Sequence, residues 1–178
     1  MNHMQLPSPQ RFLDRLFNLP ATQLGQLDHL YLDHLCYRVA TATEYEQIKR
    51  AMARDAMLLG ESQVGGRPIA TYRLHIPFTY RHRNINVIEI PAPKPGSPYP
   101  TGYEHAEFVT DRPLEAFLNL LTQSLTALPH QLDTRGLAKI TNRDIRLQLA
   151  PHLSVKFHEQ SLAEVILAEQ SQMDSGPQ

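Results

Sequence analysis

Residues 32–39 have the sequence LDHLCYRV. Successive side chains of a β-strand point to opposite faces of the sheet, so the alternation in this stretch predicts a strand with one polar and one apolar face. His34, Cys36 and Arg38 fall on the polar face, and aliphatic and aromatic side chains fall on the other. We therefore expect the first strand of the fold here.

A helix and three further strands are predicted after this strand. Residues 41–55, TATEYEQIKRAMARD, have apolar side chains at helical spacing, and Thr43 with Glu46 has the pattern of a capping box. Two glycines at 65–66 indicate a hairpin turn between two of the strands. The strands are expected at 57–64, 67–77 and 84–90. Residues 32–90 thus form a first module with the order β-α-β-β-β.

The same order returns after a proline-rich linker. Residues 91–102, PAPKPGSPYPTG, contain five prolines, which lack the N–H group that a sheet or helix requires, so we expect an extended connection of limited flexibility. The second module, residues 103–159, opens with an acidic residue and His105, as the first opens with an acidic residue and His34. Its elements are expected at 102–110, 111–125, 130–136, 143–150 and 153–159, with Asp111 capping the helix. The repeated order indicates a duplication.

Helical segments are predicted at both ends of the chain. The N-terminal segment, residues 1–31, is expected to contain helices at 8–18 and at roughly 21–31, and a C-terminal helix is expected at 160–170. The whole chain, residues 1–178, is predicted to be a single α+β domain. Its two βαβββ modules form a curved, mostly antiparallel sheet shaped as a cup.

Composition excludes several classes of protein. The formal net charge is -1, and no basic stripe of the kind that binds nucleic acid is present. The single cysteine, Cys36, cannot form an internal disulfide and fits a reducing compartment. The N-terminus lacks the pattern of a signal peptide, and no apolar run approaches the roughly 18 residues of a spanning helix. We expect a cytoplasmic protein with a small-molecule ligand, as a monomer or homodimer, without nucleic-acid or membrane partners.

Four of the eight predicted strands concentrate histidine and basic residues on one face. Beyond the first strand, the histidine and charged residues on these faces are Arg73, His75, His105, Glu107, Lys156 and His158. An antiparallel sheet with a solvated outer face is the alternative explanation, but such a face usually mixes Lys, Glu, Thr, Ser and Gln. The four histidines favour a concave polar surface that can hold a metal ion or an anionic ligand, and the solvated face remains the alternative.

A metal site is predicted from three of the polar residues. Two histidines with one carboxylate suit a divalent metal and leave coordination positions open. His34, Glu89 and His105 form the best such trio, and Fe, Mn, Zn or Ni is the expected ion. These residues are far apart in the sequence, so the duplication supports the trio more than any local motif does.

Five blocks of the sequence resemble a known family. They are DHLCYR (33–38), GGRPIATYRLHIP (65–77), NVIEIPAP (86–93), YPTGYEHAEFV (99–109) and VKFHEQSLAEVILAEQ (155–170). In this order the chain resembles the YecM-like family of bacterial proteins in the vicinal oxygen chelate superfamily, which includes glyoxalases, bleomycin-resistance proteins and extradiol dioxygenases. The resemblance covers roughly residues 25–170. It implies paired βαβββ modules with a curved sheet.

The resemblance also implies where the metal ligands lie. In the superfamily they come from the first and last strands of each module, which here gives His34, Glu89 and His105. The fourth position aligns with Lys156, and a protonated lysine has no lone pair for a metal. His158 lies two residues on and could replace it. A three-ligand site, a site completed by His158, and no bound metal all remain open.

Two classes of function follow from these expectations. The first is a metal-dependent enzyme that acts on a small oxygen-rich or carboxylate substrate, with isomerase, lyase and oxygenase chemistry all available. Its predicted parts are Arg38, Arg73 and Lys156 for a substrate carboxylate, Glu107 as general base or support for His105, and His75 and His158 as proton carriers. The second is a protein that binds or sequesters a small ligand without turnover.

Overall fold

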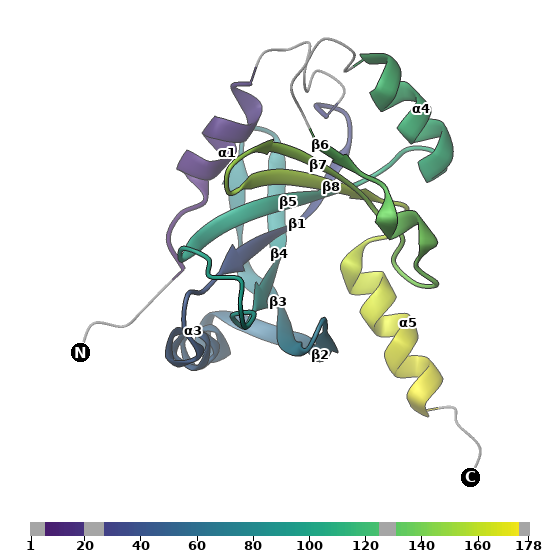
Figure 1. Cartoon of the computed structure of the whole chain (residues 1–178). Helices are drawn as coiled ribbons and strands as arrows, with labels where there is room; N and C mark the ends of the chain where they lie inside the picture. The colour runs from purple at the N-terminus through teal and green to yellow at the C-terminus, as the bar shows by residue number, and fades with distance from the viewer. Residues whose placement is uncertain (1–5, 20–26, 125–130, 175–178) are drawn as a thin grey trace. The chain divides into compact units, whose positions relative to one another are not determined.

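The computed structural model describes residues 6–19, 27–124 and 131–174 (Figure 1). The chain divides into two compact units. Unit 1 consists of Met1–Arg11 and His34–Glu104, and unit 2 consists of Phe12–Asp33 and His105–Gln178. The described strands belong to an eight-stranded mixed sheet of order β2-β3-β4-β1-β5-β8-β7-β6. This confirms the predicted α+β class.

Unit 1 has the predicted β-α-β-β-β order. Its elements are β1 (Tyr31–Arg38, of which the first three residues belong to unit 2), α3 (Ala42–Asp55), β2 (Ala56–Val64), β3 (Arg67–Tyr80) and β4 (Arg83–Pro91). The strand β1 is parallel to β4, whereas β2 with β3 and β3 with β4 are antiparallel. The bounds differ from the predicted ones by only a few residues, because apolar periodicity defines each element strongly.

Helix α3 buries one apolar face, which consists of Tyr45, Ile48, Ala51 and Met52. The capping box predicted at Thr43 and Glu46 is wrong, because the observed pair lies two residues earlier, at Thr41 and Glu44. Thr41 has the extended backbone of an N-cap, and its hydroxyl accepts the N–H of Glu44 at 3.1 Å. The Glu44 carboxylate in turn accepts the N–H of Ala40 at 2.8 Å. The sequence TATEYE contains two overlapping capping patterns, and the helix begins at the first residue after the strand that can cap it.

Unit 2 repeats the order and adds the terminal helices. Its elements are α1 (Gln10–Phe17, mostly in this unit), β5 (Gly102–Val109, from His105 onward), α4 (Leu114–Ser124), β6 (Gln131–Asp133), the 3-10 helix η1 (Arg135–Ala138), β7 (Ile145–Ala150), β8 (Leu153–His158) and α5 (Leu162–Asp174). The pair β5–β8 is parallel, and β7 pairs with both β8 and β6 in antiparallel fashion. Both modules of the predicted duplication therefore have the same strand pairing.

Two boundaries in unit 2 differ from prediction. The strand expected at 130–136 ends at Asp133, whose side chain accepts the N–H of Arg135 at 3.0 Å and starts a local turn. The helix α5 ends at Asp174 rather than at residue 170. Most of the short helix predicted for roughly 21–31 lies outside the described residues, and residues 27–30 form a turn and a bend.

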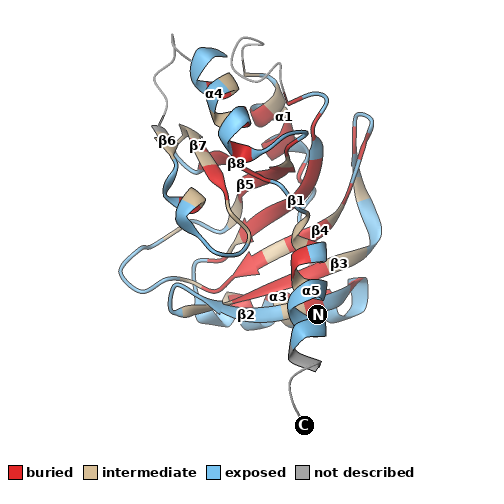
Figure 2. Ribbon diagram, turned by 90° about the vertical axis from the view of Figure 1, so that its right-hand side faces the viewer, coloured by how far each residue is buried: buried red, intermediate tan, exposed pale blue. Residues whose placement is uncertain are grey.

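The core of unit 2 contains a cluster of phenylalanines. Phe108 of β5 and Phe157 of β8 are fully buried with ring centroids 6.1 Å apart, and Phe117 of α4 lies 4.8 Å from Phe157. Phe17 of α1 packs edge-on against Phe108 at 6.3 Å. Figure 2 shows β5 and β8 as largely buried strands. This packing fixes the register of the two strands that carry the polar residues described below.

Two carboxylates from outside the helices hold the starts of α4 and α5. The N–H of Leu114 donates to Glu159 at 2.9 Å, and the N–H of Leu162 donates to Asp33 at 2.9 Å. Asp111, predicted to cap the first of these helices, instead pairs with Arg112. No helix among the described residues combines the length and the apolarity that crossing a bilayer requires.

Candidate functional site

One face of the unit 1 strands carries several of the predicted site residues. Cys36 lies opposite Glu89, and His34 lies opposite Val87, in the parallel pair β1–β4. In the antiparallel pair β3–β4, Arg73 lies opposite Val87. Residues directly opposite one another share a face, so His34, Cys36, Glu89 and Arg73 project to the same side. This agrees with the alternation expected from the sequence.

Arg38 on this face is held by an acidic residue and a tyrosine. Its Nε donates to Glu104 Oε2 at 3.2 Å, and its guanidinium lies 4.6 Å from the ring centroid of Tyr99. The Tyr99 hydroxyl donates to the other oxygen of Glu104 at 2.8 Å. Burial acts to lower the pKa of Arg38, but the Coulombic interactions with Cys36 and Glu104 and the hydrogen bond to Glu104 outweigh it, so the pKa is raised. Arg38 therefore stays a fixed cation.

His75 stands apart from the other predicted residues of unit 1. It is exposed, and it lies in the stretch between Arg73 and Phe78 where the pairing of β3 with β4 is interrupted. The alternation of side chains cannot be carried through such an irregular stretch. The structure thus places Arg73 on the polar face with His34 and Glu89, and it does not place His75 among them.

The polar residues of unit 2 gather around Glu107. His105 Nε2 lies 2.9 Å from Glu107 Oε1, and Lys156 Nζ donates to the same oxygen at 2.7 Å. His158 Nε2 lies 3.4 Å from Glu107 Oε2. The parallel register explains this arrangement, because Glu107 of β5 lies directly opposite Lys156 of β8. One carboxylate therefore contacts three of the predicted site residues.

Burial argues against the solvated outer face. The exposed fractions are 1% for His34, 3% for His105, 4% for Glu107 and 1% for His158. A group of buried ionisable side chains is costly unless its members satisfy one another or a ligand. The alternative explanation is therefore wrong for these residues, although His75 is exposed as that explanation expects.

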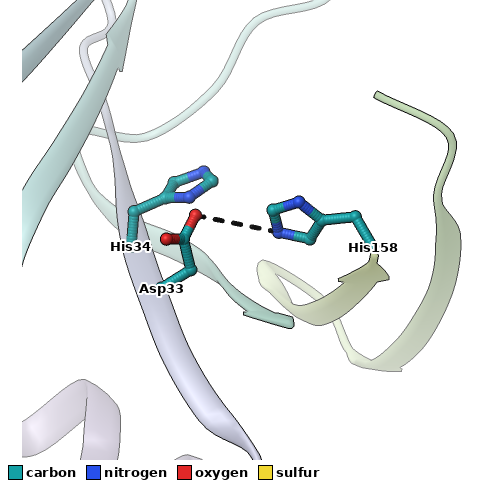
Figure 3. Close-up of side chains that lie close together, drawn as sticks. All are labelled: Asp33, His34 and His158. Carbon is teal, nitrogen blue, oxygen red and sulfur yellow. Dashed lines mark ion pairs between the residues drawn. The ribbon is translucent and has the colours of Figure 1, made fainter. Parts of the chain in front are cut away.

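Asp33 is a residue of unit 2 that sequence reasoning did not select. It is 1% exposed, and its Oδ2 lies 3.9 Å from Nε2 of His158. Figure 3 marks this ion pair with a dashed line. The same oxygen accepts the N–H of Leu162 at the start of α5. His158 thus lies near two carboxylates of its own unit, those of Asp33 and Glu107.

The signal for the missed residues was present in the sequence. Asp33 and Glu104 are the acidic members of the repeated acidic-histidine pairs, and both are 1% exposed. Strand alternation assigned them to the apolar face, so only the histidine of each pair was selected. The repetition of the whole pair was the evidence that could have identified the acidic residue as well.

Of the two positions left open for a fourth ligand, Lys156 forms an ion pair with Glu107. This contact suits an ammonium group, which has no lone pair to offer a metal. His158 offers an imidazole close to the same carboxylate. Imidazole nitrogens and carboxylate oxygens are ordinary ligands for divalent metals, so the donor set is chemically suited to such an ion.

Comparison with known proteins adds a family and a fold. A family model described as YecM protein matches residues 5–169. Protein YecM of Escherichia coli (strain K12) is 27% identical over 188 residues, which cover 90% of this chain and 90% of that protein. A solved structure described as "Structural Genomics, Protein EC4020" superposes with a TM-score of 0.74 and 26% identity, over 95% of this chain and 100% of that chain.

A second relative matches part of the chain. An uncharacterized protein of Haemophilus influenzae (strain ATCC 51907 / DSM 11121 / KW20 / Rd) is 31% identical over 84 residues, or 47% of this chain and 44% of that protein. The names of these relatives state no substrate or reaction.

Proposed function

Because this chain belongs to the YecM protein family, we propose that it is a divalent-metal-dependent enzyme that acts on a small carboxylate-bearing substrate. The observation that carries the proposal is the buried cluster around Glu107, whose carboxylate contacts His105, Lys156 and His158. Clusters of buried ionisable groups are more typical of functional sites than of sheet faces that serve packing alone.

In this proposal the metal ligands are His34, Glu89 and His105, the set that the superfamily resemblance implies. His34 and Glu89 share a face of unit 1, and His105 is buried in unit 2. Glu107 supports His105, since a carboxylate on the second ring nitrogen fixes the tautomer and orientation of a ligating histidine. When bound, a divalent ion supplies a Lewis acid for a carbonyl or enolate oxygen.

The other polar residues bind substrate and move protons. Arg38, Arg73 and Lys156 are the cations for a substrate carboxylate, and arginine adds a bidentate geometry. His158 can hold a proton between the carboxylates of Asp33 and Glu107. Isomerase, lyase and oxygenase chemistry all remain open for a site with these groups.

One contact favours a second candidate, a ligand-binding protein without turnover. Lys156 lies 2.7 Å from Glu107, and an ammonium at this distance stabilises the carboxylate and weakens it as a general base. A site in which Glu107 serves only to position its neighbours would bind a ligand but transfer no proton through this residue.

The proposal is tested by metal analysis of protein purified without a histidine tag. We expect bound Fe, Mn, Zn or Ni, and its loss in His105→Ala. His82→Ala is the matched control, because His82 is exposed in a turn. Glu89→Gln is expected to reduce metal affinity more than Glu107→Gln, since loss of a carboxylate behind a ligand typically costs about 10–100-fold.

The possible outcomes separate the candidates. Absence of metal together with no uptake on incubation contradicts the metal-dependent enzyme. Metal binding that is equally affected in Glu89→Gln and Glu107→Gln shows that the ligands are misassigned. Tight binding of a small carboxylate by protein that takes up no metal supports the second candidate.

A further inference from the structure

A second arginine accompanies Arg38 at one end of the unit 1 strands. Arg38 is the last residue of β1, and Arg67 is the first residue of β3. Between these two strands runs β4, which ends at Pro91. Ile69 lies opposite Pro91, and Cys36 lies opposite Glu89, so both arginines lie at the end of the sheet where β4 finishes.

The register also places the two arginines on one face. Arg38 is two residues from Cys36, and Arg67 is four residues from Thr71. Cys36 and Thr71 both lie opposite Glu89. Even steps along a strand keep a side chain on the same face, so Arg38 and Arg67 project to the side that carries Glu89.

One N–H group of each guanidinium is held by a hydrogen bond within the protein. Arg38 uses Nε for Glu104 and stacks on Tyr99, and Arg67 uses Nη1 for the carbonyl oxygen of Ala92 at 3.0 Å. Among the residues that the structure describes, the remaining N–H groups of these two side chains have no hydrogen-bond partner. Pre-positioned arginine donors of this kind match the oxygens of a carboxylate.

The charged side chains around the two arginines indicate the charge of the ligand. Burial lowers the pKa of Arg67, and the positive charge of Arg38 lowers it further. Glu104 neutralises one of them. Glu89 is the remaining carboxylate near Arg67, and in the proposed function its charge is taken up by the metal. One positive charge then remains for a ligand.

We propose that Arg38 and Arg67 together bind a single carboxylate group of the substrate. This inference rests on the proposed function, because it assigns the charge of Glu89 to a metal. Cys36 lies opposite Glu89, and Arg38 follows Cys36 by two residues, so the position of Arg38 is about 7 Å from that of Glu89 along the strand direction. The substrate class is therefore a small acid that carries a second oxygen function for the position beside Glu89. Arg67, which the sequence did not select, is a substrate-binding residue.

The test uses a Glu89→Gln background, which neutralises Glu89 without any metal. The probe is glycolate, titrated in the presence of a chelator while the arginine Nε–H signals of the protein are recorded by NMR. We expect the signals of Arg38 and Arg67 to shift together. Adding Arg67→Met should weaken glycolate binding by about 10-fold or more, and Arg67→Lys should restore it only in part.

Controls and contrary results are built into the same titration. Arg50→Met, at an exposed position of α3, should leave glycolate binding unchanged. The amide spectrum of each variant shows whether it is folded. Unchanged binding in a folded Arg67→Met variant, equal binding of uncharged ethylene glycol, or tighter binding of inorganic phosphate than of glycolate overturns the proposal. Since no metal takes part, these results are independent of whether the metal assignment is correct.

Discussion

At the scale of single residues, burial in unit 1 raises the pKa of two tyrosines. Tyr72 of β3 is 3% exposed. Burial raises the pKa of Tyr72 to about 12, and the negative charges of Glu61 and Glu46 add to the effect. Tyr45 of α3 donates its hydroxyl to Glu61 at 3.1 Å, and burial raises its pKa as well. Both side chains are therefore held in the neutral form by the fold.

This predicts a loss of stability in strong base. The unfolded chain releases the Tyr72 proton near pH 10, whereas the folded chain retains it to about pH 12. The folded state thus binds more protons between these values, so the free energy of unfolding decreases as the pH rises through this window. We expect urea unfolding to show the decrease, and Tyr72→Phe to reduce it. Tyr31→Phe is the control, because Tyr31 is 54% exposed, and an equal effect of both variants would contradict the assignment.

At the scale of elements, the helix starts in unit 2 depend on carboxylates that lie far away in the sequence. Asp33 accepts the first N–H of α5, and within the helix Ser161 and Glu164 form a reciprocal capping box. The free N–H groups at a helix start carry a partial positive charge, which a carboxylate stabilises. Asp33, which immediately precedes His34 in β1, therefore joins the start of α5 to that strand.

Two replacements of Asp33 should lower the free energy of unfolding by different amounts. Asp33→Asn keeps an oxygen that can accept the N–H of Leu162 but removes the negative charge, so we expect the smaller loss. Asp33→Ala leaves the partly buried N–H of Leu162 without its acceptor, and we expect a loss of about 1–3 kcal/mol in the free energy of unfolding. Chemical denaturation measures both. Glu169→Gln, at an exposed position of α5, is the control. A loss in Asp33→Ala no larger than in this control would show that the contact does not hold the helix.

The same elements show what the sequence could and could not predict. Apolar periodicity predicted both βαβββ modules, because each strand and helix buries one face. The residues that cap the helices were predicted less well. The sequence TATEYE contains two equivalent capping patterns for α3. The start of α4 is held by Glu159, which follows a later strand and so could not be found from the local sequence. For the site, alternation predicted that Glu107 and Lys156 lie on polar faces, and only the pairing register brings them together. Asp33 was missed because alternation assigns it to an apolar face.

At the scale of the whole molecule, neither unit is continuous in the sequence. The chain changes unit at residues 11/12, 33/34 and 104/105. Unit 2 needs α1, whose Phe17 packs on Phe108, and it needs Asp33 for the start of α5. Unit 1 needs Glu104 and Tyr99, which lie beyond most of the linker and hold Arg38. We therefore expect that the proline-rich linker does not separate two halves that fold independently.

This interleaving predicts the result of cutting the chain between residues 96 and 97. The fragment 1–96 retains Phe17 and Arg38 but loses Phe108 and Glu104, and the fragment 97–178 loses the partners of those residues. Each fragment thus lacks part of both units, and buried apolar and charged groups are left without their contacts. We expect each fragment alone to be insoluble or to give a poorly dispersed amide spectrum, whereas co-expression of the two should restore a folded complex. If each fragment unfolds cooperatively and shows a dispersed spectrum by itself, the halves are independent domains, and the argument that His34 and His105 share one metal site fails.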